Sequence, residues 1–249
     1  CDEAGIVQDG FSFQAGAGGT ALSFALFLRD MMRERNIKAR FVRGGSTQYL
    51  VDMLEEGLTD YILDGQTFDL EGVRSMRENS GHQNTSPFTS YNWHGKGNFA
   101  SMLDAVVLGA TEVDVNFNAN VVTHSDGRLL HGIGGWQNCL ASKCTILPIP
   151  SFRDRIPVIV DSVTTLCGPG ELIDVIVTER GIAINPMRRD LIESLKGSTL
   201  PIRTIEEIKN EVEEICGGAA AKPILGEKVV AAIKWVDGTV IDCVRQVGE

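Results

Sequence analysis

The chain has 249 residues, of which 43% are hydrophobic and 22% charged, and its formal net charge is −10. It is therefore long enough for a substantial core, has the composition of a globular protein, and with this acidic surface is not expected to bind nucleic acid or anionic lipid. No apolar run reaches the roughly 20 residues of a membrane-spanning helix, and the start shows no signal-peptide pattern, so we expect a cytoplasmic protein.

The first part of the chain alternates short strands with helices. A strand is predicted over 11–14, a helix with an apolar face over 21–35 and a second strand over 39–45. This alternation predicts an α/β domain with an open, mostly parallel sheet flanked by helices. The pattern continues with a helix over 47–57, which stops at a glycine, and a third strand over 60–65.

Residues 65–103 break the pattern, because they are polar, contain several glycines and show no periodicity. A connection of this length predicts a functional loop, or a lid over residues 72–98 that closes on substrate.

The second half of the chain is richer in short strands. Ser125-Asp126-Gly127 predicts a hairpin turn, and Asp237-Gly238 predicts another in the closing segment. Thr204 with Glu207 has the spacing of a capping box at the start of a helix over 205–215. We predict one domain over 1–249, with 219–249 as a β-rich hairpin extension. Further elements are a helix over 136–142, strands within 144–150, 155–166 and 171–184, and a helix over 187–195.

Six cysteines are scattered without a C-x-x-C pair, and four histidines have no metal-ligand spacing. We therefore expect free thiols in a reducing compartment, no metal site and no permanently bound cofactor. The chain starts at Cys1 rather than at methionine, which predicts a processed chain or a piece of a longer one.

The turn "QAGAGG" after the first strand is the first candidate site. Gly16, Gly18 and Ala21 satisfy the loose G-x-G-x-x-G/A dinucleotide fingerprint. The preceding strand alternates polar and apolar residues, however, and the second strand ends near Arg43 rather than near an acidic residue. Two alternatives stay open: a corner that close packing requires, or a cradle of backbone N–H groups for an anion or oxyanion.

Glycine turns recur at two further predicted strand ends, in "VRGGST" and in "GIGGW". Ligands bind at this edge of an open α/β sheet, so we predict that the three turns supply amides to one site. The candidate catalytic residues are Gly18, Gly19, Gly45, Gly134 and Gly135.

Arg43 is the cation of the second glycine turn. Its guanidinium could hold a carboxylate by two parallel hydrogen bonds, or it could be a solvated surface arginine. At the end of the third predicted strand, Asp64 and Gln66 could bind a substrate hydroxyl, or Asp64 could cap a helix.

Asn116, Asn118 and Asn120 alternate on one face of a predicted extended segment. Asparagine is depleted in strands, so these amides either contact a ligand or form a local turn network. Glu112 and Asp114 also share a face, but the separation that glycosidase chemistry requires cannot be read from a sequence. The candidate substrate-binding residues of the whole chain are Gly16, Thr20, Arg43, Ser46, Asp64, Gln66, Asn118 and Asn120.

Several long segments together resemble the alpha subunit of citrate lyase. They occur in order and cover nearly the whole chain, and they are similar to roughly the second half of a family chain. The most specific are "FQAGAGGTALSFALFLRDMM", "FVRGGSTQYLVDMLEEGLTDYILDGQTFDL", "LDAVVLGATEVDVNFNANVVT", "GIGGWQN" and "RIPVIVDSVTTLCGPGELIDVIVTERGIAINPMRRDLIESL".

The resemblance implies the α/β fold of CoA transferases and the transfer of citrate onto a thioester carrier, by which acetyl-acyl carrier protein and citrate give citryl-acyl carrier protein and acetate. It implies CoA or the carrier's phosphopantetheine thioester as substrate. The implied partners are the beta and gamma (acyl carrier) subunits of citrate lyase, in an oligomer.

Distant CoA transferases use a glutamate nucleophile in an "S-E-N-G" segment after the second strand, whereas the similar "VRGGST" has no glutamate. The resemblance therefore implies direct acyl exchange without a covalent enzyme intermediate. The chain departs from the family pattern after "GIGG", where it has Trp136-Gln137-Asn138. The alternatives are a sugar-phosphate isomerase-like or phosphate-sensing domain of similar fold, which would bind phosphate at Gly16–Thr20, or a non-catalytic half that docks other subunits.

Overall fold

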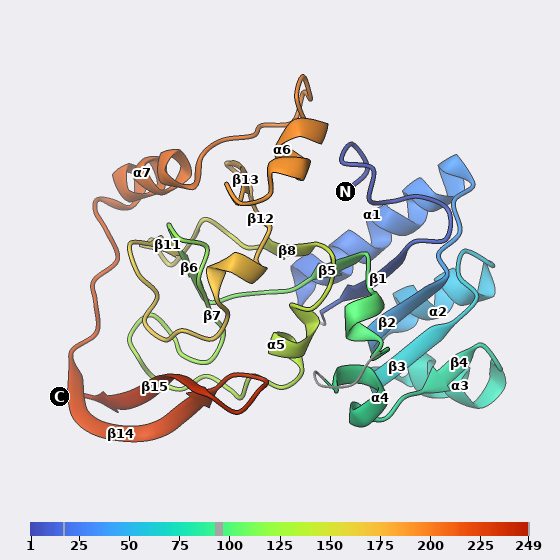
Figure 1. Ribbon diagram of the computed structural model, residues 1–249, viewed down its shortest axis with the longest axis horizontal. Coiled ribbons are helices and arrows are strands. Elements are labelled where there is room, and N and C mark those ends of the chain that lie inside the picture. The colour runs from blue at the N-terminus through green and yellow to red at the C-terminus, as the bar shows by residue number, and fades with distance from the viewer. Residues whose placement is uncertain (17, 93–96, 249) are drawn as a thin grey trace. The chain divides into compact units, whose positions relative to one another are not determined.

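The computed structural model describes residues 1–16, 18–92 and 97–248 (Figure 1). The chain divides into two compact units. The N-terminal unit consists of Cys1–Leu108 and Ala141–Cys144, and the C-terminal unit consists of Gly109–Leu140 and Thr145–Glu249. The assignment of the whole chain to one domain with a hairpin extension over 219–249 stays a prediction.

The described part of the N-terminal unit contains a sheet of five parallel strands in the order β5-β1-β2-β3-β4. This arrangement confirms the predicted open parallel sheet, because each predicted strand pairs with the one that follows it in the chain. The strands are β1 (Ser12–Ala15), β2 (Phe41–Ser46), β3 (Ile62–Thr67), β4 (His82–Asn84) and β5 (Ala105–Val107).

Helices α1 (Gly19–Arg35), α2 (Gln48–Glu55) and α3 (Leu70–Glu78) connect β1 to β4, and neighbouring helices pack against each other. The predicted helices over 21–35 and 47–57 are confirmed, and α1 begins two residues earlier than predicted. Its buried face recurs at helical spacing, as the sequence pattern indicated. That face consists of Ala21, Ala25, Leu28 and Met32.

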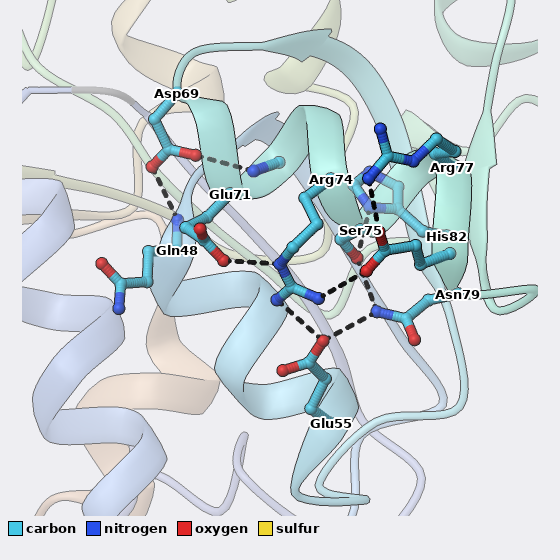
Figure 2. Close-up of polar contacts among 11 residues, drawn as sticks. Gln48, Glu55, Asp69, Glu71, Arg74, Ser75, Arg77, Asn79 and His82 are labelled. Carbon is cyan, nitrogen blue, oxygen red and sulfur yellow. Dashed lines mark hydrogen bonds and ion pairs between the residues drawn. The ribbon is translucent and has the colours of Figure 1, made fainter.

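One carboxylate and one guanidinium join α2 to α3 (Figure 2). The Asp69 carboxylate accepts the N–H of Gln48 at the start of α2 and that of Gly72 in α3, each at 2.7 Å. The Arg74 guanidinium donates to Glu71 of its own helix and to Glu55 of α2. The same acidic side chain therefore accepts a backbone N–H from the first turn of each helix, and it holds the starts of α2 and α3 together.

The prediction of an irregular loop over 65–103 is wrong. This stretch contains α3, β4, α4 (Pro87–Tyr91) and the 3₁₀ turn η1 (Ala100–Met102). Periodicity missed α3 because its apolar residues are largely exposed, Leu70 by 84%, and α4 is too short to show a period. Residues 93–96 of the predicted lid lie outside the described residues.

Strand β1 is buried on both faces, although its sequence alternates polar and apolar residues. Ser12 has no exposed surface, and its hydroxyl donates to the Met102 carbonyl and bonds with Asp104. The polar alternation is therefore no argument against a central strand here, because the hydroxyl is satisfied inside the unit.

The C-terminal unit contains several small sheets among its described residues. Strands β8 and β12 are parallel and β13 is antiparallel to β12, while β6 pairs with β11 in parallel and with β7 in antiparallel fashion. The bounds are β6 (Glu112–Asp114), β7 (Ala119–Asn120), β8 (Thr145–Pro148), β9 (Phe152–Arg153), β10 (Ile156–Pro157), β11 (Ile159–Val160), β12 (Val175–Thr178) and β13 (Gly181–Ile184); the helices are α5 (Trp136–Cys139), η2 (Gly170–Leu172), α6 (Arg189–Ser194) and α7 (Ile205–Cys216).

Both predicted hairpin turns are confirmed. The chain closes with the antiparallel pair β14 (Leu225–Lys234) and β15 (Val240–Val247), and the turn at Gly238 has a φ of +92°. At the earlier turn the Gly127 N–H donates to the His124 carbonyl. All six cysteines are free thiols. Among the helices of the described residues, none combines the length and apolar character needed to cross a membrane.

The capping box at the start of α7 is also confirmed, since Thr204 and Glu207 each accept the other's backbone N–H. We expect Thr204→Ala to lower the free energy of unfolding by about 1 kcal/mol, because two backbone donors lose their fixed partners. Urea unfolding measures this, with the exposed Glu214→Ala of the same helix as control, which should change stability by less than about 0.5 kcal/mol. Equal stability of Thr204→Ala and the parent protein would contradict the assignment.

Candidate functional site

The carboxyl ends of β1, β2 and β3 lie along one edge of the N-terminal sheet (Figure 1). Strands β2 to β4 follow on one side of β1, whereas β5 lies on its other side. The winding therefore reverses between β1 and β5, which is the point where open α/β sheets bind ligands. The glycine turn leaves β1 at this point, and the Gly16 N–H donates to the Val107 carbonyl of β5 at 2.9 Å.

Close packing does not require the glycines of this turn. A Cβ built on Gly18 or Gly19 would meet no atom within 4 Å, and one on Gly16 would make only ordinary contacts. Gly18 has a φ of −72°, which any residue adopts. The packing-corner alternative is therefore wrong for this turn, and the absence of side chains leaves its backbone accessible.

The start of α1 is also electrostatically open. No side chain caps Gly18, and the first turn of this 17-residue helix holds no acidic residue. At α2 and α3, by contrast, the Asp69 carboxylate occupies the helix starts (Figure 2). Exposed N–H groups with the positive end of a helix dipole behind them favour an anion. These groups belong to Gly18, Gly19 and Thr20, all of which are exposed.

The second predicted glycine turn is wrong, because Gly44 and Gly45 lie within β2 and pair with β3, and both are packed rather than open. Gly44 has a φ of +118°, and a Cβ there would lie 2.6 Å from the Ala15 carbonyl oxygen. At Gly45 a Cβ would lie 1.6 Å from the Phe68 ring, so the ring occupies the space where a side chain would be. The packing of Phe68 therefore requires a glycine at 45, and the catalytic role of the Gly45 amide stays a prediction.

Arg43 is completely buried in β2, so the alternative of a solvated surface arginine is wrong. Its Nη1 donates to the Ser90 carbonyl at 3.2 Å, and its guanidinium lies 4.8 Å from the centre of the Tyr91 ring. Among the described residues, Nε and Nη2 have no hydrogen-bond partner. A buried guanidinium with two free donors is costly unless an anion uses them.

A buried polar network lies at the ends of β2 and β3. The Ser46 hydroxyl lies 3.2 Å from His82 Nε2, and Asp64 Oδ2 lies 3.6 Å from the same nitrogen. The other ring nitrogen of His82 contacts Ser75 at 2.9 Å. Sequence reasoning did not select His82 or Ser75, because a lone histidine without metal-ligand spacing gives no local signal.

Asp64 does not cap a helix, which corrects that alternative. Its Oδ1 accepts the N–H of Gln66 at 2.8 Å and its Oδ2 the hydroxyl of Thr67 at 2.6 Å, while Gln66 itself is exposed. Burial raises the pKa of the Asp64 carboxyl, but the hydrogen-bonding groups around it, led by His82 and Thr67, together bring the pKa below its ordinary value of 3.8.

The lowered pKa of Asp64 predicts how the stability of the protein depends on pH. A carboxyl whose pKa is lower in the folded state stabilises the fold above its ordinary pKa, and this contribution disappears as the pH falls through the lowered value. We expect Asp64→Asn to lose less stability than the parent protein between about pH 5 and pH 2. Urea unfolding against pH measures this, with the exposed Asp60→Asn as control. Parallel stability curves for the parent and Asp64→Asn would contradict the network.

The asparagines of the C-terminal unit form a local turn network. Residues 114–118 turn between β6 and β7, and Phe117 has a φ of +66°, so the predicted extended segment with three asparagines on one face is wrong. Asn118 donates to Asp114 and accepts the Gly170 N–H. The buried Asn120 donates to Glu112 and accepts two backbone N–H groups.

The same network accounts for the two neighbouring carboxylates. Glu112 accepts the N–H and hydroxyl of Thr164, and Asp114 accepts the N–H groups of Asn116 and Asn118. These carboxylates fix loop backbone, so the glycosidase pair is not supported. The binding roles of Asn118 and Asn120 stay predictions.

The third glycine turn precedes α5 in the C-terminal unit. Gly134 is exposed with a φ of +60°, and Gly135 is the N-cap of α5 without a side-chain cap. The following departure from the family pattern has a packing role, because Trp136 Nε1 donates to the Gly109 carbonyl and Gln137 Nε2 to that of Cys167. The catalytic roles of Gly134 and Gly135 stay predictions.

Comparison with known proteins agrees with this fold. A Pseudomonas malonate decarboxylase hetero-tetramer, 16% identical, contains a chain that matches 87% of this one with a TM-score of 0.54, which shows the fold alone. The putative alpha subunit of citrate lyase from Streptococcus mutans, solved in complex with citrate, is 43% identical with a TM-score of 0.96 over 99% of this chain and 49% of its own. The mostly parallel sheet flanked by helices, together with these structural neighbours, shows an α/β protein of CoA-transferase-like fold.

The family is shown by sequence as well. The model "Citrate lyase, alpha subunit (CitF)" matches residues 1–247. The citrate lyase alpha chain of Escherichia coli (strain K12) is 41% identical over 248 residues, which are 99% of this chain and 48% of that protein. The chain belongs to the citrate lyase alpha subunit family. It spans about half the length of the curated relatives that it matches.

Proposed function

We propose that this chain takes part in the transfer of citrate onto a thioester carrier, in which an acetyl thioester and citrate give a citryl thioester and acetate. The observation that carries the proposal is the open start of α1 at the switch point of the sheet, in a chain of this family. The Streptococcus mutans relative was solved with citrate, which supports citrate as the acid.

The proposed reaction is a direct exchange between the two substrates. A citrate carboxylate oxygen attacks the acetyl carbonyl, a C–O bond forms, and the C–S bond breaks to release the carrier thiolate. The thiolate then attacks the citryl carbonyl of the mixed anhydride, which forms the new C–S bond and releases acetate. Each attack passes through a tetrahedral oxyanion, and the enzyme needs to orient the reactants and stabilise this charge.

The N-terminal unit offers groups for both tasks. The N–H groups at the uncapped start of α1 would receive the oxyanion. Arg43 would bind a citrate carboxylate, and Asp64 with Gln66 would lie beside it at the same edge. The segment around Gly45 is the one that resembles the nucleophile segment of distant CoA transferases. In this chain the Phe68 ring, rather than a nucleophilic side chain, fills the space beside Gly45.

The proposal extends to partners of stated chemistry. The carrier would be CoA or the phosphopantetheine thioester of an acyl carrier subunit, and the chain would act in an oligomer with the beta and gamma subunits of citrate lyase. No permanently bound cofactor is needed, because both bonds exchange between the substrates themselves.

An exchange assay tests the proposal directly. The intact protein is incubated with citrate and acetyl-CoA, and the products are separated by chromatography. We expect citryl-CoA and acetate in equal amounts, and no product without citrate. Hydrolysis of acetyl-CoA at the same rate with and without citrate, or no reaction together with isomerisation of a sugar phosphate, would contradict it.

A further inference from the structure

The two free donors of Arg43 lie on the same edge of its guanidinium. Nη1 is occupied by the Ser90 carbonyl, whereas Nε and Nη2 are without partners among the described residues. Nε–H and the adjacent Nη2–H point in parallel, and their spacing matches the two oxygens of one carboxylate. The unused part of the side chain is therefore a complete bidentate fork.

The burial of this fork favours a planar, singly charged group. Arg43 has no exposed surface and takes part in no ion pair among the described residues. A carboxylate would use both free donors and neutralise one buried charge with one opposite charge. A tetrahedral phosphate would present only two of its oxygens to the planar fork and leave the others unpaired beside it. The chemistry of the fork thus selects a carboxylic acid.

Two features could give a ligand access to the fork. The five-residue helix α4 covers the guanidinium through the Ser90 carbonyl and the Tyr91 ring. A helix of one turn has few backbone hydrogen bonds to lose when it moves. Gly65 is exposed, and a Cβ built there would lie 3.6 Å from Nη2 and 3.4 Å from the Tyr91 hydroxyl. Gly65 therefore adjoins the fork at van der Waals distance, and a ligand reaches Nη2 when α4 moves aside.

We propose that the Nε–Nη2 edge of Arg43 binds one carboxylate of the acid substrate side-on, beneath α4 and past Gly65. This inference rests on the proposed function for the identity of the acid, which is citrate. It deepens that function because it names the binding atoms and makes the site selective for carboxylate over phosphate.

Calorimetric titration of the intact protein with citrate, and separately with inorganic phosphate, tests the site. We expect Arg43→Lys to weaken citrate binding roughly 30-fold, because a point charge cannot form two parallel bonds. Gly65→Ala keeps the arginine and places a methyl group beside Nη2 without a severe contact, and it should weaken citrate binding at least about tenfold. Arg40→Lys, at a half-exposed arginine of the same strand region, is the control and should bind citrate as the parent does.

The possible results distinguish an error in the binding site from an error in the proposed reaction. Citrate binding within threefold of the parent in both Arg43→Lys and Gly65→Ala would overturn the site, as would phosphate binding that depends on Arg43 when citrate binding does not. If Arg43→Lys unfolds, Gly65→Ala alone decides. If the two variants lose citrate binding but the parent protein transfers no acyl group, the site is supported and the proposed function is wrong. If Gly65→Ala transfers the acyl group with an unchanged citrate KM, the proposed function is supported and the site is wrong.

Discussion

Replacement of Gly18 by serine is expected to lower turnover of the acyl exchange about 100-fold while the protein becomes about 0.3 kcal/mol more stable. Serine is a preferred N-cap residue, and Gly18 is an N-cap without a side chain in open space. The new hydroxyl would accept an N–H from the first turn of α1. The same N–H groups then no longer receive the oxyanion, so stability and activity move in opposite directions.

Thermal unfolding and a steady-state exchange assay on the intact protein measure the two effects. Ser23→Ala, at the next turn of the same helix and with its hydroxyl directed to the Gly19 carbonyl, is the matched control and should leave turnover unchanged. A Gly18→Ser protein that is fully active and more stable would show that the start of α1 is not part of the site. Loss of both stability and activity would show a packing role that the structure does not contain.

Gly170→Ala is expected to destabilise the C-terminal unit by roughly 3 kcal/mol or more. A Cβ at this position would lie 1.9 Å from the Asn116 carbonyl oxygen and 2.9 Å from the Asn118 nitrogen. Both are backbone atoms, so no side chain can rotate away. The turn over 114–118 would have to shift, and with it the hydrogen bond between the Gly170 N–H and Asn118.

Urea unfolding followed by tryptophan fluorescence, to which Trp136 and Trp235 of the C-terminal unit contribute, measures this effect. Gly109→Ala is the matched control in the same unit, since a Cβ there meets no atom within 4 Å, and its stability should change by less than about 0.5 kcal/mol. Similar stability of the two variants would mean that the Asn116–Asn118 turn does not approach Gly170 as described.

The N-terminal sheet was predictable because its signals are local. Strands β1 to β3 alternate with helices along the chain, and α1 buries Ala21, Ala25, Leu28 and Met32 at helical spacing. The α3 helix gave no such signal because Leu70 and Val73 face outward. Its start is instead marked by Asp69, which also satisfies α2, and such a shared cap is visible only in three dimensions.

The sequence predicted where the candidate site lies, but not which of its residues are buried and which are exposed. The glycine turns were located from residue type alone, yet the sequence could not show that Gly45 lies against Phe68 while Gly18 is open. The burial of Arg43 depends on Ser90, which is 47 residues away in the chain. The segment that holds Asn118 and Asn120 was expected to be extended, but a turn with a positive φ at Phe117 interrupts it, and the alternative of a local turn network is the one that the structure shows.

The central claim is that the two substrates exchange directly and that backbone amides, not an attacking side chain, carry the reaction. A single-turnover experiment with acetyl-CoA and citrate labelled with ¹⁸O in its carboxylates tests it, with excess intact protein and mass analysis of the acetate. Direct exchange transfers one citrate oxygen through the mixed anhydride, so the account predicts acetate that carries one ¹⁸O in the first turnover. Unlabelled acetate in that turnover would mean that a carboxylate of the protein attacked first, and would contradict the account.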